Sequence, residues 1–165
     1  MKFIVSKELQ NSSLIRILIL FFLLSIALFF AFQPFLEKES LGLNIEELTS
    51  KILGNEELFI PALSFSDLLE RIHIDLFLRL IAALSLLAIT VRLMKNKTLL
   101  LFFILTLNIS IFLNALSPIL VHFGWSYFAF IKVSAYWVQH ILFWLLILYC
   151  FFKLIYPIKR ISQNV

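Results

Sequence analysis

The chain has 165 residues, of which 62% are hydrophobic, and its mean hydropathy is +1.01. Soluble domains usually contain about 45–50% apolar residues, so this composition excludes an ordinary water-soluble globular protein and favours a single membrane domain. The net charge of +4 and the pI near 9.3 would suit a nucleic-acid partner, but the charges are distributed as in a membrane protein, and we predict no nucleic-acid binding.

Most of the charge lies in the gaps between the apolar stretches of the chain, and one sign predominates within each charged gap. Nine of the fourteen Lys and Arg residues lie at the N-terminus, in one short loop and at the C-terminus: Lys2, Lys7, Arg16, Arg92, Lys95, Lys97, Lys153, Lys159 and Arg160. Eight of the ten acidic residues lie between Glu37 and Glu70. Because Lys and Arg near span ends favour the cytoplasmic side, we expect both termini in the cytoplasm. The Ile-, Phe-, Lys- and Leu-rich composition suggests a bacterial inner membrane.

Four spans are predicted, at about residues 17–36, 72–93, 98–121 and 133–152, within one domain covering residues 1–165. The boundaries follow the apolar runs, since a helix needs about 20 residues to cross the hydrocarbon layer. The first run is long, Phe-rich and without an evident small-x-small cleavage site, so we expect an uncleaved anchor rather than a signal peptide.

The loop of residues 37–71, between the first two spans, contains a helix signal. Asn44 followed by Glu47 is a variant of the capping box, Leu48 and Ile52 share a helical face with Ile45, and Gly54 is a suitable terminator. The predicted fold is therefore all-α: an integral membrane four-helix bundle with a short extracytoplasmic amphipathic helix between spans 1 and 2. A helix this short needs a surface to rest on, which would be the membrane, the bundle or a partner.

Polar side chains of three spans fall at similar predicted depth in the outer leaflet. Arg79, Asn114 and His140 are each about seven residues, or about 10 Å, inside their span ends. Asp75 and Tyr136 lie about one turn nearer the surface. The candidate polar layer consists of Asp75, Arg79, Asn114, Tyr136, Gln139 and His140.

Two interpretations of this layer remain open. In the first, the groups only join helices, with Asp75 neutralising Arg79 and the amides bonding across the bundle, each such bond contributing about 0.6 kcal/mol. In the second, the layer binds a ligand or handles protons, because charged groups inside a membrane are expensive and often functional.

Histidines give only a weak metal signal. His73 and His122 are both predicted near the outer surface and could share an ion with a loop acid, whereas His140 lies about 10 Å deeper. A haem held by two histidines at one depth fits this arrangement poorly. We predict no cofactor, with haem or a metal ion left open.

No phosphate loop, HExxH motif or nucleophile elbow is present, and Cys150 is the only cysteine, so thiol–disulfide exchange within the chain is excluded. We predict a small non-catalytic subunit or assembly partner of a membrane complex, in contact with lipid and, through loop 37–71, with membrane or extracytoplasmic proteins. The alternative is a site at Asp75, Arg79, Asn114, Tyr136 and His140 that binds a small molecule, a proton, or a haem or metal cofactor.

Overall fold

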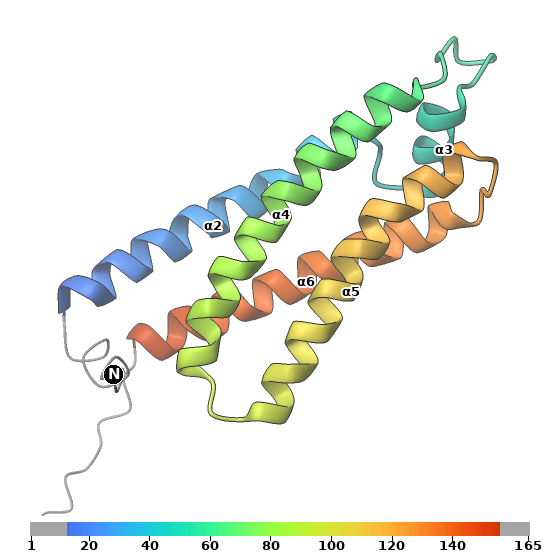
Figure 1. Ribbon diagram of the computed structural model, residues 1–165. Coiled ribbons are helices and arrows are strands. Elements are labelled where there is room, and N and C mark those ends of the chain that lie inside the picture. Colours follow the sequence, from blue (N-terminus) through green and yellow to red (C-terminus); the bar gives the residue numbers. More distant parts are fainter. Residues whose placement is uncertain (1–12, 156–165) are drawn as a thin grey trace, which may run out of the picture.

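The computed structural model describes residues 13–155, and this part of the chain is helical with no strand (Figure 1). Four helices are long and apolar enough to cross a membrane: α2 (Ser13–Ser40), α4 (Phe65–Leu93), α5 (Lys97–His122) and α6 (Phe128–Ile155). A short helix, α3 (Ile45–Leu53), lies between α2 and α4. The predicted fold class, four apolar spanning helices with one short amphipathic helix between the first two, is confirmed.

The long helices extend past the predicted spans at both ends, except that α4 ends at Leu93 as predicted. They have 26 to 29 residues, which at about 1.5 Å per residue exceeds a hydrocarbon thickness of about 30 Å. Two extensions matter for the site. Helix α2 continues to Ser40 and α6 begins at Phe128, so that Glu37 and Lys132 lie on helices within the bundle rather than in loops.

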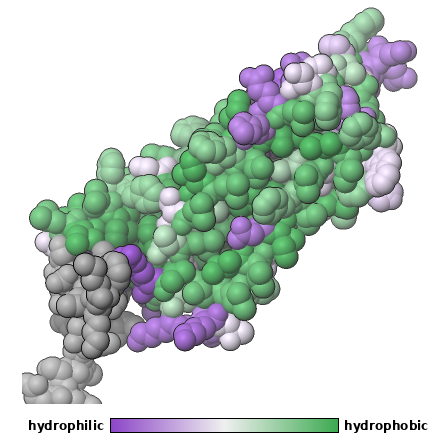
Figure 2. Space-filling model, in the orientation of Figure 1, coloured by the Kyte–Doolittle hydropathy of each residue, from purple (hydrophilic) through white to green (hydrophobic). Residues whose placement is uncertain are grey.

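The helices form an elongated bundle in which α5 packs most extensively against α6, α4 against α5, and α2 against α6 (Figure 1). We call the end that carries α3 the outer end and the opposite end the inner end. Helix α2 begins and α6 ends at the inner end, near the turn between α4 and α5. The face of the bundle seen in Figure 2 is mainly apolar along its length, with polar residues gathered toward the two ends.

Side-chain caps fix where several helices begin. The Asn44 side chain accepts a hydrogen bond from the Glu47 amide at 2.7 Å, and Ser64 Oγ accepts one from the Asp67 amide at 3.1 Å. Asn96 caps α5 in the same way, accepting from the Leu99 amide at 3.1 Å. These bonds satisfy amides that have no partner within the helix. The cap predicted at Asn44 is thus confirmed.

Helix α3 rests on the outer end of the bundle, against α5 and α6. Its Leu48 and Ile52 are fully buried, in a small core with Leu41, Leu68, Val121 and Ala129. Ile45, which the periodicity placed on the same face, is 44% exposed, so the buried face is formed by the last two turns of α3. Gly54 ends the helix as predicted, with a φ of 85° that favours glycine.

A second, larger core fills the inner half of the bundle. It consists of apolar side chains from all four long helices, including Leu23, Leu86, Leu107, Phe143 and Leu146. Pro118 lies inside α5, which continues one turn beyond it to His122 rather than ending there.

Candidate functional site

Glu37, on the last turns of α2, is the centre of a buried ionic group in the outer half of the bundle. Its Oε2 pairs with Arg79 Nη2 on α4 at 2.8 Å, and its Oε1 pairs with Lys132 Nζ on α6. The Arg79 and Lys132 side chains are each only 2% exposed. One carboxylate therefore joins three helices through two charge-assisted hydrogen bonds.

Arg79 is held from four directions. Besides the bond to Glu37, its Nε donates to Asp75 Oδ1 at 2.8 Å and its Nη1 donates to Gln139 Oε1 at 3.0 Å. The guanidinium also lies over the Tyr136 ring, 5.2 Å from the centroid. The planar guanidinium directs its donors to several partners at fixed angles, whereas a lysine would offer a single ammonium on a flexible chain.

Two amide side chains extend the network. Gln33 on α2 donates to Asp75 Oδ1 at 3.0 Å, and Asn114 on α5 donates to Gln139 Oε1 at 3.3 Å. The polar cluster thus comprises eight residues from the four long helices: Gln33, Glu37, Asp75, Arg79, Asn114, Lys132, Tyr136 and Gln139. Its formal charges cancel, since two carboxylates face one guanidinium and one ammonium.

A cavity of about 230 Å³ lies beside the cluster, mostly between α2 and α4 and partly open to the surface. Its polar lining comes from Gln33, Glu37, Ser40, Arg71, Asp75, Asn114 and Lys132. Three buried atoms of the cluster have no hydrogen-bond partner among the described residues: Asn114 Oδ1, Gln139 Nε2 and the Tyr136 hydroxyl. Buried polar atoms normally have a partner, and of these three residues only Asn114 also lines the cavity.

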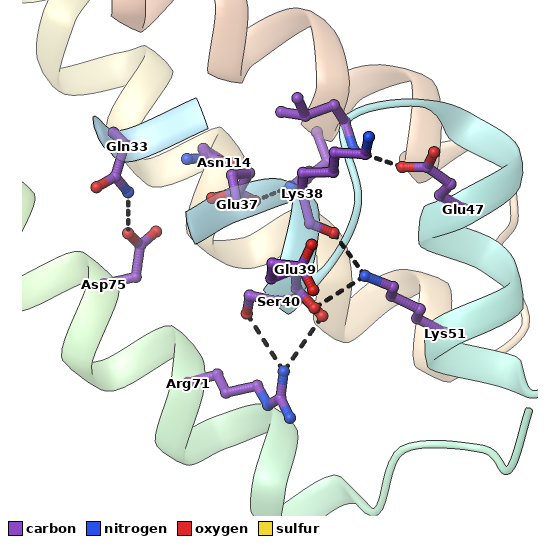
Figure 3. A network of polar contacts seen from close by, with 12 residues as sticks. Gln33, Glu37, Lys38, Glu39, Ser40, Glu47, Lys51, Arg71, Asp75 and Asn114 are labelled. Atoms are coloured by element: carbon purple, nitrogen blue, oxygen red, sulfur yellow. Dashed lines mark hydrogen bonds and ion pairs between the residues drawn. The ribbon is translucent and has the colours of Figure 1, made fainter. Parts of the chain in front are cut away.

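The C-terminus of α2 is fixed by two basic side chains from neighbouring helices (Figure 3). Lys51 of α3 donates to the carbonyls of Lys38 and Glu39 at 2.6 and 2.9 Å, and Arg71 of α4 donates to the Ser40 carbonyl at 3.2 Å. Cations at a helix C-terminus complement the free carbonyls and the helix dipole. These bonds hold the turn that carries Glu37 in place.

Of the six residues of the predicted polar layer, the structure brings five together: Asp75, Arg79, Asn114, Tyr136 and Gln139. His140 makes no bond to the ionic group. Its ring stacks on Tyr136 with centroids 5.8 Å apart, and its Nε2 accepts a hydrogen bond from Trp144 Nε1 at 3.2 Å.

The sequence prediction omitted Gln33, Glu37 and Lys132 from the layer. Gln33 and Glu37 follow Leu23, Ile26 and Phe30 at alternating spacings of three and four, and all five are buried. Continuing that stripe past the last apolar residue would have placed Glu37 inside the bundle. Lys132 likewise precedes the buried Tyr136 and Gln139 at spacings of four and three.

The two weak metal candidates lie near the outer end. His73 is exposed on α4, and His122 packs its ring against Phe65, with centroids 5.3 Å apart. Within residues 13–155 no three His, Cys, Asp or Glu side chains are grouped as metal ligands.

The cluster can do two things chemically. Its paired charges can fix which helices meet and in what register, and the cavity wall can receive hydrogen-bond donors. Asp75 Oδ2, Gln33 Oε1 and Asn114 Oδ1 are all acceptors without a partner in the described part of the chain.

Comparison with known proteins identifies a family. No curated protein and no solved structure matches the chain. A family described as a transmembrane helical domain, Aq_1264_TM, matches residues 42–161, which include α3 to α6 and leave α2 outside. Within the matched region the buried cations Arg79 and Lys132 outnumber the carboxylate of Asp75, and Glu37 of α2 supplies the balancing charge. The chain is a multi-pass membrane protein that belongs to the Aq_1264_TM family of transmembrane helical domains.

Proposed function

We propose that the protein is a small non-catalytic subunit or assembly partner of a membrane complex, and that it binds a second protein through the loop between α3 and α4. The observation that carries this proposal is an ordered apolar tip at the outer end. Phe59 is 93% exposed and Leu58 beside it is 62% exposed.

The tip is a turn held together by hydrogen bonds of its own. Asn55 and Ile60 pair through two backbone hydrogen bonds of 2.8 and 2.9 Å, and the Asn55 side chain accepts from the Leu58 amide at 3.1 Å. Phe59 has a φ of +54°, a conformation uncommon for a residue other than glycine, asparagine or aspartate. Strain of this kind tends to occur where a side chain is presented for binding.

The surroundings of the tip favour a protein partner over lipid. The loop lies beyond the N-terminal end of α4, at the far end of the long axis of the bundle, whereas lipid contacts its sides (Figure 1). Glu56 and Glu57 are exposed next to Leu58 and Phe59. The matching surface is an apolar pocket edged by basic side chains, since aromatic anchors in such pockets carry much of the affinity of interfaces.

Charge supports an extracytoplasmic tip in a bacterial inner membrane. Arg16, Arg92, Lys95, Lys97 and Lys153 lie on the inner end or its turn, where the described part of the chain has no acidic residue. Basic residues mark the cytoplasmic side, so the outer end faces away from the cytoplasm and both termini lie within it. Lys2, Lys7, Lys159 and Arg160, which the sequence analysis also used, lie outside the described residues.

Photo-crosslinking tests the proposal directly. A photoreactive amino acid placed at position 59 should capture one stoichiometric partner in intact membranes, and the same residue at position 123 serves as the control. Phe123 is 65% exposed at the same end of the bundle but in the α5–α6 turn. Phe59→Ser should leave folding unchanged, because the side chain contacts solvent, and should lose the partner on purification in mild detergent. Equal crosslinking at both positions, or a partner retained by Phe59→Ser, would contradict the proposal.

A second candidate function is ligand binding at the polar cluster, favoured by the cavity and the free oxygen of Asn114. A small molecule, a proton, or a haem or metal cofactor are the alternatives for the ligand. Asp75→Asn and His140→Ala distinguish a small molecule in the cavity from a cofactor on His140, because Asp75 lines the cavity and His140 does not. Loss of function in folded Asp75→Asn with normal His140→Ala favours a small molecule in the cavity, and the reverse favours a cofactor on His140.

A further inference from the structure

We infer that the cavity between α2 and α4 binds the headgroup of an ethanolamine phospholipid, with the ammonium group inside the cavity and the phosphate at Arg71. This inference rests on the second candidate function, ligand binding at the polar cluster, and names its ligand class. It is independent of the docking proposed for Phe59.

The polar wall of the cavity favours a group with several donors. Gln33 Oε1, Asp75 Oδ2 and Asn114 Oδ1 belong to three cavity-lining residues on three helices, and none of these oxygens has a partner among the described residues. Asn114 itself is 4% exposed. A primary ammonium carries three N–H donors, so it can satisfy three acceptors together, one of them a carboxylate oxygen.

The backbone of α5 adds a feature at the same wall. Pro118 lines the cavity and lacks an N–H, so the carbonyl of Asn114, four residues earlier, has no helical donor at that position. The Asn114 amide nitrogen is already engaged with Gln139, so the free groups at this residue, Oδ1 and the backbone carbonyl, are both acceptors.

The charge around the mouth favours an anionic group next to the ammonium. Arg71 lies one helical turn beyond Asp75 toward the outer end, about 6 Å along α4. Only its Nη1 is engaged, with the Ser40 carbonyl and hydroxyl at 3.2 and 3.3 Å, so the other guanidinium donors face no described partner (Figure 3). Glu37 and Asp75 are balanced by Arg79 and Lys132, and Arg71 is the cation left for a phosphate.

The apolar wall indicates that the ligand comes from the bilayer. Leu36, Ile74 and Leu78 line the cavity and are also among the exposed large hydrophobic side chains of the bundle. The cavity is therefore continuous with the lipid-facing surface of α2 and α4, and acyl chains can lie on that surface while the headgroup enters sideways. A soluble amine would gain nothing from these side chains.

A headgroup series on the unaltered protein tests the inference. The protein is reconstituted in nanodiscs of phosphatidylethanolamine, its N-methyl and N,N-dimethyl derivatives, or phosphatidylcholine, all with the same acyl chains, and bound lipid is measured by native mass spectrometry after mild extraction. Retention should fall stepwise with each methyl group, because each removes one donor. Equal retention of all four lipids overturns the ethanolamine assignment while leaving ligand binding at the cluster standing.

A matched pair of variants locates the site. Asn114→Leu should reduce the preference for phosphatidylethanolamine over phosphatidylcholine by about tenfold, the effect of one hydrogen bond to a charged group. Asn108→Leu is the control, because Asn108 is on the same helix but bonds the Ile104 carbonyl at 2.8 Å, away from the cavity. A preference that survives Asn114→Leu places the lipid elsewhere and overturns the inference. Soluble phosphoethanolamine that displaces the lipid at equal concentration would assign the site to a soluble ligand and overturn the lipid source.

Discussion

The outer and inner halves of the bundle are held together by different chemistry. In the outer half, Glu37, Arg79 and Lys132 join α2, α4 and α6 through buried charges. In the inner half, apolar side chains such as Leu86 and Leu146 fill the space between the same helices.

Buried charges and apolar packing contribute differently to how a small membrane bundle selects one arrangement. Surrounding lipid is as apolar as leucine, so apolar packing alone discriminates weakly between alternative helix faces and registers. A buried charge without its partner is costly, so the ionic group penalises every arrangement that separates Glu37 from Arg79 and Lys132. We interpret the outer half as specifying which helices meet, and the inner half as filling the interface once they have met.

Glu37→Gln should give the largest effect, because it removes the charge that two buried cations share. We expect the free energy of unfolding to fall by about 3–5 kcal/mol, the range for breaking a buried ion pair. The measurement is reversible unfolding in mixed micelles.

Two further variants separate this charge effect from a general loss of helix stability. Glu39→Gln, two residues along α2 and exposed, should change the unfolding free energy by less than about 0.5 kcal/mol. Adding Lys132→Met to Glu37→Gln should recover part of the loss, because the pair then leaves no unpaired ammonium. If Glu37→Gln has the same free energy of unfolding as the unaltered protein, the stability of the outer half does not depend on its buried charges.

Leu146→Ala should have a smaller effect in the inner half, although Leu146 is fully buried. We expect about 2 kcal/mol, at the low end of the range for such truncations, because separated helices in a bilayer keep this side chain in an apolar medium and only packing is lost. The same unfolding assay measures it. A loss of unfolding free energy greater than that of Glu37→Gln would mean that the inner half, not the outer half, contributes more to stability.

The sequence predicted the inner half well and the outer half in part. Apolar runs and charge sign were sufficient for four helices, and the cap at Asn44 was readable from residue type and spacing. Span boundaries were drawn where charges begin, which excluded Glu37 and Lys132 for the very reason that they are charged. Buried opposite charges from distant segments neutralise each other in the folded bundle. A hydropathy sum over one segment includes only one of the two charges, so that segment is scored as too polar to lie inside the bundle.

His140 shows the opposite limit. Its predicted depth matched that of Arg79 and Asn114, yet depth along a helix does not determine the face on which a side chain lies. On α6 it lies one position after Gln139, so it is rotated by about 100° away from Arg79 and packs on Tyr136 and Trp144 instead. Only tertiary packing settles such a choice.

Thr90→Val should change the free energy of unfolding least. It tests most directly whether apolar packing alone holds the inner half together. Thr90 Oγ1 bonds the Leu86 carbonyl at 2.8 Å and lies 3.3 Å from Cys150 Sγ on α6, a buried polar contact between two helices of this core. Valine has nearly the same shape, and the sulfur is a weak partner, so the unfolding free energy should change by about 0.6 kcal/mol or less. The coupling between the two side chains is the difference between the effect of Cys150→Ala in the Thr90→Val background and its effect in the unaltered protein. A coupling above about 2 kcal/mol would mean that a polar contact also specifies the inner half, and the distinction between the two halves would then be one of degree.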